Sequence, residues 1–207
     1  ESHGTNCPGQ RPERHVSVGG LGAAVERVSV VRAWELVQIG EALIVDLREP
    51  SEFARGHPKG ALSLPYSEKG LEDRLGVLLQ PGSPVVLLAE APGQAQSAVL
   101  QLQESAFPVV GVVGGSMMAW SDSDLPLEIM AEVSVRQLAG AVPGGDIVVL
   151  DVREPIEWEM GHVPGALLIS LGTLRKRLHE VPQEVRIAVI CEAGVRSSSA
   201  ASVLQAA

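Results

Sequence analysis

The sequence predicts an α/β protein made of two domains of one kind, each a parallel sheet flanked by helices. Residues 46–62 (DLREPSEFARGHPKGAL) and 151–167 (DVREPIEWEMGHVPGAL) are identical at ten of seventeen positions, at a constant offset of 105. A period this long exceeds that of a solenoid repeat and indicates two copies of a whole domain. In both copies, strand-sized runs of Val, Ile and Leu alternate with segments of helical length, which is typical of a parallel sheet covered on both faces.

Composition limits the class of protein further. The chain has 207 residues, 45% hydrophobic and 3% aromatic, so each core must be built mainly from aliphatic side chains. A net charge of −9 argues against nucleic acid or an anionic membrane surface as a partner. No apolar run is long enough for a transmembrane or secretory segment. Because only Cys7 and Cys191 are present, we expect no disulfide framework and a cytoplasmic, reducing location.

Both copies follow the same expected order of elements. A serine, Ser29 or Ser134, can cap a short first helix. A buried strand, a polar turn and a loop with Gly-His and Gly-Ala come next, and a charged helix and a second apolar strand follow. That strand leads into a Gly-containing loop and a further helix. The expected strands are 42–48 and 85–89 in the first copy and 147–153 and 187–190 in the second, and the expected charged helices are 67–79 and 170–180.

The repeat predicts an N-terminal tail or remnant over 1–25, a first domain over 26–128 and a second over 131–207. The first copy continues through 107–120, which predicts a further strand, a Gly-Gly turn and a helix. The second copy ends before this point and lacks about twenty residues of its twin. Because a missing core strand would expose backbone groups, we expect a longer native chain. Alternatively, 16–25 (VSVGGLGAAV) fills the gap or belongs to a neighbouring domain.

Cys191 stands at the end of the second apolar strand of the second copy. It is followed by Glu192, Ala193, Gly194, Val195 and Arg196, and then by Ser197, which opens a helix. Backbone N–H groups at a helix start can cradle an anion and lower the pKa of a thiol. Arg196 offers a fork of donors to an anionic substrate. The loop therefore predicts a thiolate nucleophile beside an anion site.

These residues carry a family resemblance. CEAGVRS after a strand, with DVREPIEWEMGHVPGAL upstream, resembles the rhodanese (sulfurtransferase) domain family over nearly all of 28–207, in two copies. The resemblance implies that Cys191 takes a sulfane sulfur from an anionic donor and becomes a persulfide. It also implies that Arg196 holds the donor while Glu192–Val195 and Ser197 surround the sulfur. Cyanide, a small thiol or a protein acceptor would then remove the sulfur, with no cofactor and no metal.

The first copy departs from this pattern at the loop. Ala89 replaces the nucleophile, Pro92 stands at the position of Gly194, and Gln94 replaces the arginine. We therefore expect the first copy to be catalytically inactive, a scaffold or docking half.

Other residues of the motif are present in both copies, and this favours structural roles for them. Asp151 and Arg153 correspond to Asp46 and Arg48, so a fold-stabilising pair is favoured over residues that orient the loop. His57 and His162 are interpreted as structural for the same reason. For Glu192, a specificity role beside the pocket and a structural or solvated role both stay open, because Glu90 holds the matching place in the first copy. His3, Cys7 and His15 match no common metal-ligand spacing.

Several alternatives to a sulfurtransferase stay open. Cys191 could belong to a non-enzymatic persulfide carrier or sensor, or the chain could be part of a larger sulfur-metabolising fusion. A phosphatase or arsenate reductase is disfavoured, since the related phosphatases have a loop one residue longer. An interaction module suits the first copy better than the second. The sequence leaves the donor open among thiosulfate, a small persulfide and 3-mercaptopyruvate.

Overall fold

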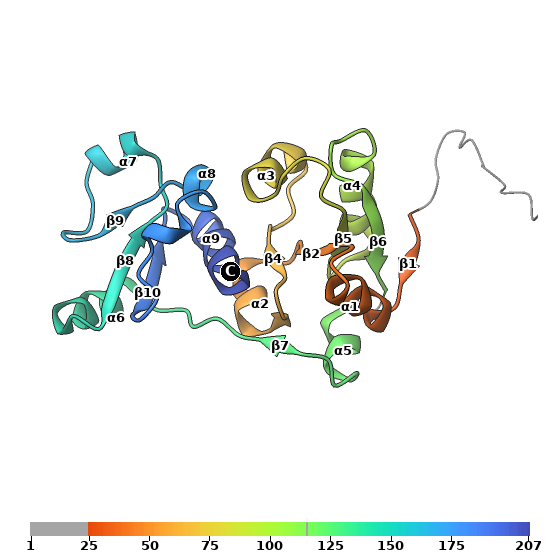
Figure 1. Cartoon of the computed structure of the whole chain (residues 1–207), viewed down its shortest axis with the longest axis horizontal. Helices are drawn as coiled ribbons and strands as arrows, with labels where there is room; N and C mark the ends of the chain where they lie inside the picture. Colours follow the sequence, from red (N-terminus) through yellow and green to blue (C-terminus); the bar gives the residue numbers. More distant parts are fainter. Residues whose placement is uncertain (1–24, 115) are drawn as a thin grey trace, which may run out of the picture.

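The computed structural model describes residues 25–114 and 116–207. The two copies of the repeat lie side by side along the long axis of the molecule, and each carries its own parallel sheet (Figure 1). The prediction of an α/β fold with helices flanking parallel sheets is confirmed. The elements of the first copy are β1 (Arg27–Val28), α1 (Val30–Gln38), β2 (Leu43–Asp46), α2 (Pro50–Arg55), β3 (His57–Pro58), β4 (Leu62–Ser63), α3 (Leu71–Leu78), β5 (Val85–Leu88), α4 (Pro92–Leu102), β6 (Val109–Val113), α5 (Ser116–Ser121) and β7 (Leu127–Glu128).

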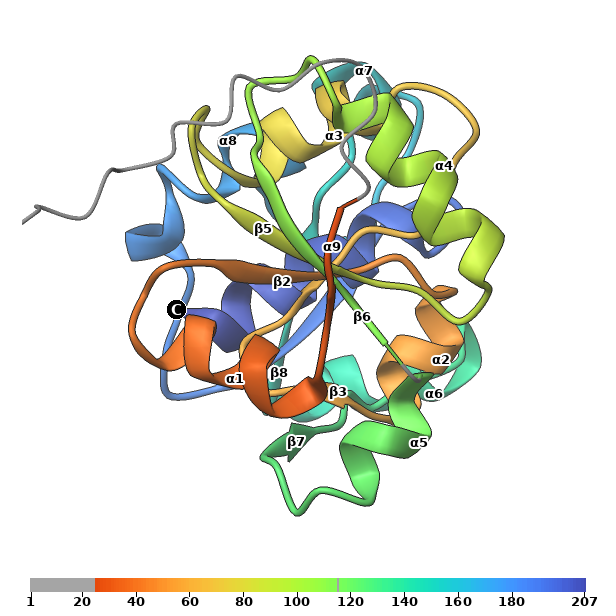
Figure 2. The same ribbon diagram turned by 90° about the vertical axis from the view of Figure 1, so that its right-hand side faces the viewer.

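The first copy has a sheet of five parallel strands in the order β1-β6-β5-β2-β4, seen as a twisted fan in Figure 2. Successive side chains of a strand point to opposite faces of the sheet. Ile44 and Val86 accordingly belong to a core with α1, α2 and α5, whereas Val45 and Leu87 belong to a second core with α3 and α4. All four residues of β5 are buried, because strands lie on both sides of β5 and helices cover both its faces.

The second copy repeats this order with fewer strands. Its described sheet has the parallel order β10-β8-β9, which corresponds to β5-β2-β4 of the first copy. The Ser29 and Ser134 caps are confirmed, because each hydroxyl accepts a backbone N–H three residues later. The elements of the second copy are α6 (Val135–Ala141), η1 (Val142–Gly144), β8 (Ile147–Asp151), α7 (Pro155–Glu159), β9 (Leu167–Leu168), α8 (Leu171–Leu174), η2 (Leu178–Glu180), β10 (Arg186–Ile190) and α9 (Val195–Ala206).

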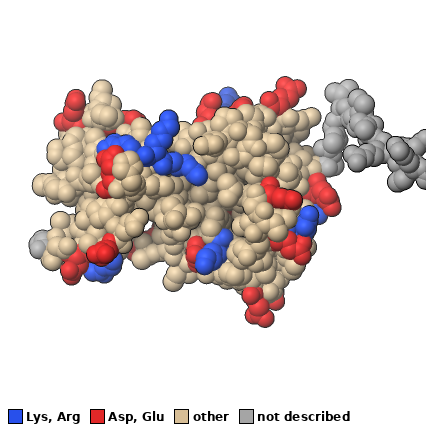
Figure 3. Space-filling model, viewed as in Figure 1, with Lys and Arg blue, Asp and Glu red and all other residues tan. Residues whose placement is uncertain are grey.

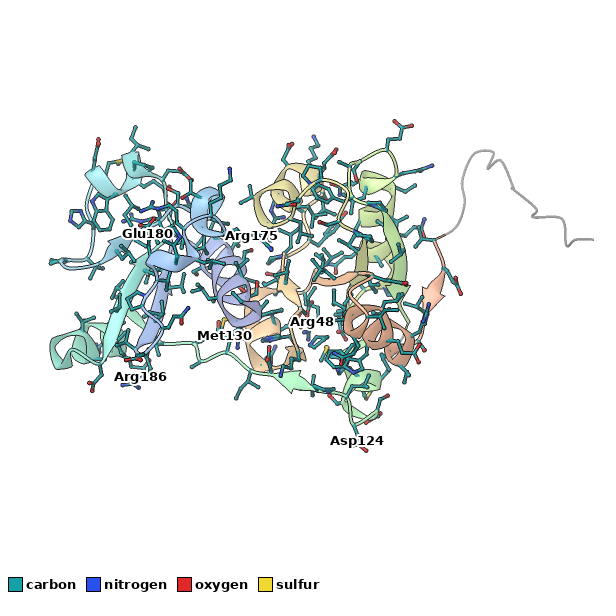
Figure 4. All side chains as sticks on the ribbon, viewed as in Figure 1. Arg48, Asp124, Met130, Arg175, Glu180 and Arg186 are labelled. Atoms are coloured by element: carbon teal, nitrogen blue, oxygen red, sulfur yellow. The ribbon has the colours of Figure 1, made fainter. Side chains whose placement is uncertain are left out.

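The prediction of one charged helix over 170–180 is wrong. The segment contains the single helical turn α8 and the 3₁₀ turn η2, separated by a tight turn in which the Arg177 N–H bonds the carbonyls of Thr173 and Leu174. Gly172 and Thr173 lie within α8 and have low helix propensity, which weakens this single turn. The side chain of Arg175 leaves this segment and donates to the carbonyl of Leu78, 2.8 Å away in the first copy. Figure 4 shows Arg175 where the two copies meet.

Helix α9 joins the two copies, because it packs between β10 of its own sheet and β4 of the first (Figure 1). At Ser63 on β4, the backbone N–H donates to Ser202 Oγ at 3.0 Å, and the backbone carbonyl accepts from Ser199 Oγ at 2.7 Å. The hydroxyls of Ser63 and Ser198 are 2.7 Å apart. These serines satisfy edge groups that β4 would otherwise bury without partners. One hydrophobic core continues across the junction, from Leu62 and Leu75 to Leu150 and Val203.

Strand β10 is less covered than its counterpart β5. The side chains of Ile187–Ile190 are half-buried, and among the described residues no strand pairs with β10 on the side where β6 pairs with β5. The expected further strand over 107–120 of the first copy is found as β6. The alternative that 16–25 fills the equivalent gap in the second copy concerns residues that, except for Val25, lie outside the described part.

On the face drawn in Figure 3, charged side chains form small, separate groups. One small group of basic side chains lies beside acidic ones over the second copy, and most of the remaining face is uncharged. No helix within the described part of the chain is both long and apolar enough to cross a membrane.

Candidate active site

Cys191 lies directly after β10, at the carboxyl end of its sheet. β10 pairs in parallel with β8, so the chain leaves the sheet at the edge where ligands bind in open α/β folds. The loop then turns into α9, which begins at Val195. Cys191 is a free, half-buried thiol, whereas Glu192 and Ala193 are exposed. The sequence prediction of a strand–loop–helix unit around Cys191 is therefore confirmed.

Hydrogen-bond donors of the loop converge on the sulfur. The backbone N–H groups of Gly194 and Ser197 donate to Cys191 Sγ at 3.1 Å and 3.3 Å, and Ser197 Oγ lies 3.4 Å from the same atom. Gly194 has φ of +85°, a left-handed conformation that glycine adopts without strain. This conformation is the N-cap of α9 and directs the Gly194 N–H back toward the sulfur.

The same contacts set the protonation of the thiol. Burial acts to raise the pKa of Cys191, but the hydrogen bond with the Ser197 hydroxyl and the hydrogen bonds from the N–H groups of Ser197, Gly194 and Ala193 outweigh it. The pKa of Cys191 is therefore lowered from that of an ordinary thiol. A lower pKa increases the fraction of thiolate, the form in which cysteine acts as a nucleophile.

Arg196 is held by a carboxylate that the sequence prediction did not include. Its Nη1 and Nη2 atoms donate to Glu157 on α7, at 2.6 Å and 2.7 Å. The Arg196 guanidinium lowers the pKa of Glu157 to about 2, and Glu157 raises the pKa of Arg196. Both groups are partly exposed. The predicted anion-binding residue thus lies beside the loop, with its two terminal nitrogens bonded to Glu157.

The Asp and Arg residues that are identical in the two copies form the same contacts in both. Arg153 Nη2 binds the buried Asp151 at 2.7 Å and the carbonyl of Gly161 at 2.9 Å. The Arg48–Asp46 pair binds the carbonyl of Gly56 in the same way. This pair therefore ties the end of a strand to the Gly-His loop, as a fold-stabilising role requires.

Both histidines of the Gly-His motifs also have structural partners. His162 stacks on Trp158 with ring centroids 3.8 Å apart, and its Nδ1 lies 3.1 Å from the Trp158 carbonyl. His57 stacks on Phe53 in the same manner. The Phe53–His57 stack fixes the turn after α2, and the Trp158–His162 stack fixes the turn after α7. These contacts agree with structural roles for the two histidines.

The first copy has the same strand–loop–helix unit without its sulfur contacts. Ala89 follows β5, and α4 begins at Pro92, one position earlier in the repeat than α9. Proline has no N–H to donate, Gln94 carries no charge, and Ala95 has no hydroxyl. A cavity of about 220 Å³ lies beside this loop, and its lining includes Ala89 and Pro92 together with Arg27 of β1 and Val112 of β6.

Two sets of contacts were not predicted from the sequence: those of Glu157, and those of Ser199 and Ser202. Glu157 occupies the same repeat position as Glu52, so the repeat marked it as a shared residue. Nothing in the sequence indicated that its side chain binds Arg196. The serines after the loop predicted only a helix start, whereas Ser199 and Ser202 hold β4. Within the described part of the chain, no cluster of three His, Cys, Asp or Glu side chains could hold a metal ion. His3, Cys7 and His15 lie outside the described residues.

A sequence profile described as the rhodanese-like domain matches residues 29–123 and 134–207. The chain belongs to the rhodanese-like domain family. Among curated relatives, YrkF of Bacillus subtilis, a candidate sulfur carrier by name, is 33% identical over 93 residues, which are 44% of this chain and 48% of that protein. The thiosulfate sulfurtransferase GlpE of Pseudoalteromonas translucida is 29% identical over 72 residues, 35% of this chain and 69% of that protein. The chain spans less than two thirds of the first relatives it matches.

Two solved structures overlap with parts of the chain. The thiosulfate sulfurtransferase from Pseudomonas aeruginosa covers 87% of this chain, and 41% of that protein is matched, at 21% identity and a TM-score of 0.40. The polysulfide-sulfur transferase homodimer from Wolinella succinogenes covers 52% of this chain, and 81% of its own chain is matched, at 26% identity and a TM-score of 0.44. The family assignment rests on the profile match and on the paired strand–loop–helix units.

Proposed function

We propose that this protein is a sulfurtransferase whose second copy, residues 131–207, accepts a sulfane sulfur on Cys191 and passes it to a thiophilic acceptor. The observation that carries the proposal is the convergence of the Gly194 and Ser197 N–H groups on Cys191 Sγ. These donors favour the thiolate before transfer. After transfer, the same loop surrounds a persulfide anion, whose charge lies on the outer sulfur, with the amides at the start of α9.

The chemistry is a two-step exchange. In the first step, the Cys191 thiolate attacks the outer sulfur of a donor, a new S–S bond forms, and the donor's S–S bond breaks with its electron pair leaving on sulfite or a thiolate. In the second step, an acceptor such as cyanide attacks the outer sulfur of the persulfide and leaves as thiocyanate, which restores the Cys191 thiolate. No external oxidant or reductant is needed, since one neutral sulfur atom is transferred in each step.

We further propose that the first copy, residues 26–128, is catalytically inactive and supports the second. Ala89 provides no nucleophile, and Pro92 provides no N–H at the position of Gly194. The Ser63 contacts with Ser199 and Ser202 favour a scaffold role, because they hold the helix that carries the sulfur loop. A reducing compartment such as the cytoplasm suits a free Cys191 thiol.

The test is an intact-mass measurement after incubation with a sulfane donor, either thiosulfate or a small persulfide. We expect an adduct of one sulfur atom that cyanide removes as thiocyanate, and no adduct in Cys191→Ser. Loss of the adduct in Cys191→Ser together with its retention in Ala89→Ser assigns the sulfur to the second copy. No adduct with either donor, combined with hydrolysis of an aryl phosphate, would overturn the proposal.

A second candidate function is a persulfide carrier for a protein acceptor. It is favoured by the similarity to the candidate sulfur carrier YrkF, which is 33% identical over the matched part. The two functions differ in turnover. An enzyme forms many equivalents of thiocyanate per chain with donor and cyanide in excess, whereas a dedicated carrier forms about one equivalent until its acceptor protein is added.

A further inference from the structure

The pairing of Arg196 with Glu157 bears on which donor the site accepts. Both terminal nitrogens of the guanidinium are bonded to the two carboxylate oxygens, in the fork-to-fork geometry of strong ion pairs. Glu157 Oε2 also accepts the backbone N–H of Glu154 at 2.9 Å, as part of the capping box of α7. Because the Glu154 N–H anchors the carboxylate, an incoming anion must compete for Arg196 with a Glu157 that is held in place.

The other charges around the loop do not compensate for this pairing. Arg153, the second guanidinium near the site, is bonded to the buried Asp151. Glu192 adds a carboxylate within the loop, and both Glu192 and Cys191 interact electrostatically with Arg196. Each of the two arginines is therefore matched by a carboxylate. The thiolate and Glu192 remain as an excess of negative charge at the place where the donor must approach.

We infer that Glu157 is a specificity-determining residue that selects donors of low negative charge. The inference rests on the proposed function and names its donor class: a persulfide R–S–SH with at most one negative charge, in preference to the dianion thiosulfate. In the favoured step, the Cys191 thiolate bonds to the outer sulfur of R–S–SH, the S–S bond of the donor breaks, and RS⁻ leaves with the electron pair of that bond. The transferred sulfur keeps its proton until it ionises within the loop. Thiosulfate would bring two negative charges toward a guanidinium that Glu157 already occupies.

The experiment compares donors in single-turnover measurements of the sulfur adduct on the full chain. The donors are thiosulfate and the persulfide of 2-mercaptoethanol. The variants are Glu157→Gln, which removes the charge, and Glu157→Asp, which keeps it. Glu159→Gln is the matched control, because it makes the same charge change at an exposed residue of α7.

We expect the parent chain to react faster with the persulfide than with thiosulfate. Glu157→Gln should accelerate the thiosulfate reaction by about tenfold, as expected from removing one negative charge beside a guanidinium, and the persulfide reaction by less than about twofold. Glu157→Asp and Glu159→Gln should keep the donor ratio of the parent. Higher salt should reduce the advantage of Glu157→Gln with thiosulfate, because ions screen the interaction.

The ratio of the two rate constants is the decisive readout, because a variant that merely distorts the loop slows both donors alike. Equal changes for both donors in Glu157→Gln would overturn the inference, and so would a parent chain that prefers thiosulfate. Either result leaves the proposed function intact, since an adduct still forms on Cys191. Absence of an adduct with both donors in the parent would instead overturn the proposed function and the donor preference with it.

Discussion

The loops after β5 and β10 begin alike and end differently. Both follow a parallel strand and lead into a helix, but α4 starts at Pro92 and α9 starts one repeat position later, after Gly194. Because Gly194 adopts φ of +85°, its N–H faces Cys191 Sγ. Proline has neither that N–H nor access to that φ value. The comparison teaches that the sulfur site depends on the course of the backbone as much as on the cysteine.

The copies also differ in what covers their central strands. β5 is buried along its whole length, whereas β10 is half-buried. The second copy obtains part of its support from the first, through the contacts of α9 with Ser63 on β4 and through the shared core. The first copy therefore holds the helix whose first turn completes the loop around Cys191.

The largest expected effect comes from giving the second copy the proline of the first. Gly194→Pro removes one donor to Cys191 Sγ and forces a different backbone, so sulfur transfer should fall by more than about a hundredfold. The thiol pKa should rise, because one hydrogen bond to the thiolate is lost. Iodoacetamide alkylation of Cys191, followed across pH, should therefore have a higher midpoint than in the parent. Gly194→Ala, which keeps the N–H, is the control and should lose less activity than Gly194→Pro.

The converse change tests the first copy. Ala89→Cys, made in a Cys191→Ser chain, should give less than about a hundredth of the parent's sulfur transfer, because the new thiol has no N–H from position 92 and no guanidinium at position 94. Adding Pro92→Gly, Gln94→Arg and Ala95→Ser should increase the rate over the single change. Thiocyanate formation measures both. Substantial turnover from Ala89→Cys alone would show that the backbone donors are dispensable.

The smallest expected effect concerns the junction between the copies. Ser202→Ala leaves the buried Ser63 N–H without a partner, so the free energy of unfolding should fall by about 1–3 kcal/mol. Urea unfolding followed by circular dichroism measures the loss. Ser51→Ala, at an exposed position of α2, should change the free energy by less than about 0.5 kcal/mol. Equal effects of the two substitutions would mean that Ser202 does not couple α9 to β4.

Much of this architecture could be predicted from the sequence. The repeat of DLREP and DVREP indicated two copies, and the apolar runs located β2, β5, β8 and β10 to within a few residues. The capping serines were identified because a hydroxyl before an apolar segment has a local role that spacing alone reveals. The prediction of one helix over 170–180 was wrong because Leu174 and Leu178 have helical spacing, but α8 ends at Leu174 and the chain turns before η2.

For the site, the sequence by itself determined which residues stand in the loop: Cys191 at a strand end, Gly194 where the chain must turn, and Arg196 at the helix start. Those are local properties, fixed by neighbours in the chain. Only the tertiary structure decided that Arg196 binds Glu157, which lies on α7 and is separated from α9 in the chain by β9, α8, η2 and β10. It also decided that Ser199 and Ser202 bind Ser63 of the other copy. Such pairings depend on how distant segments pack against each other. The hydrophobic periodicity within one segment does not predict that packing.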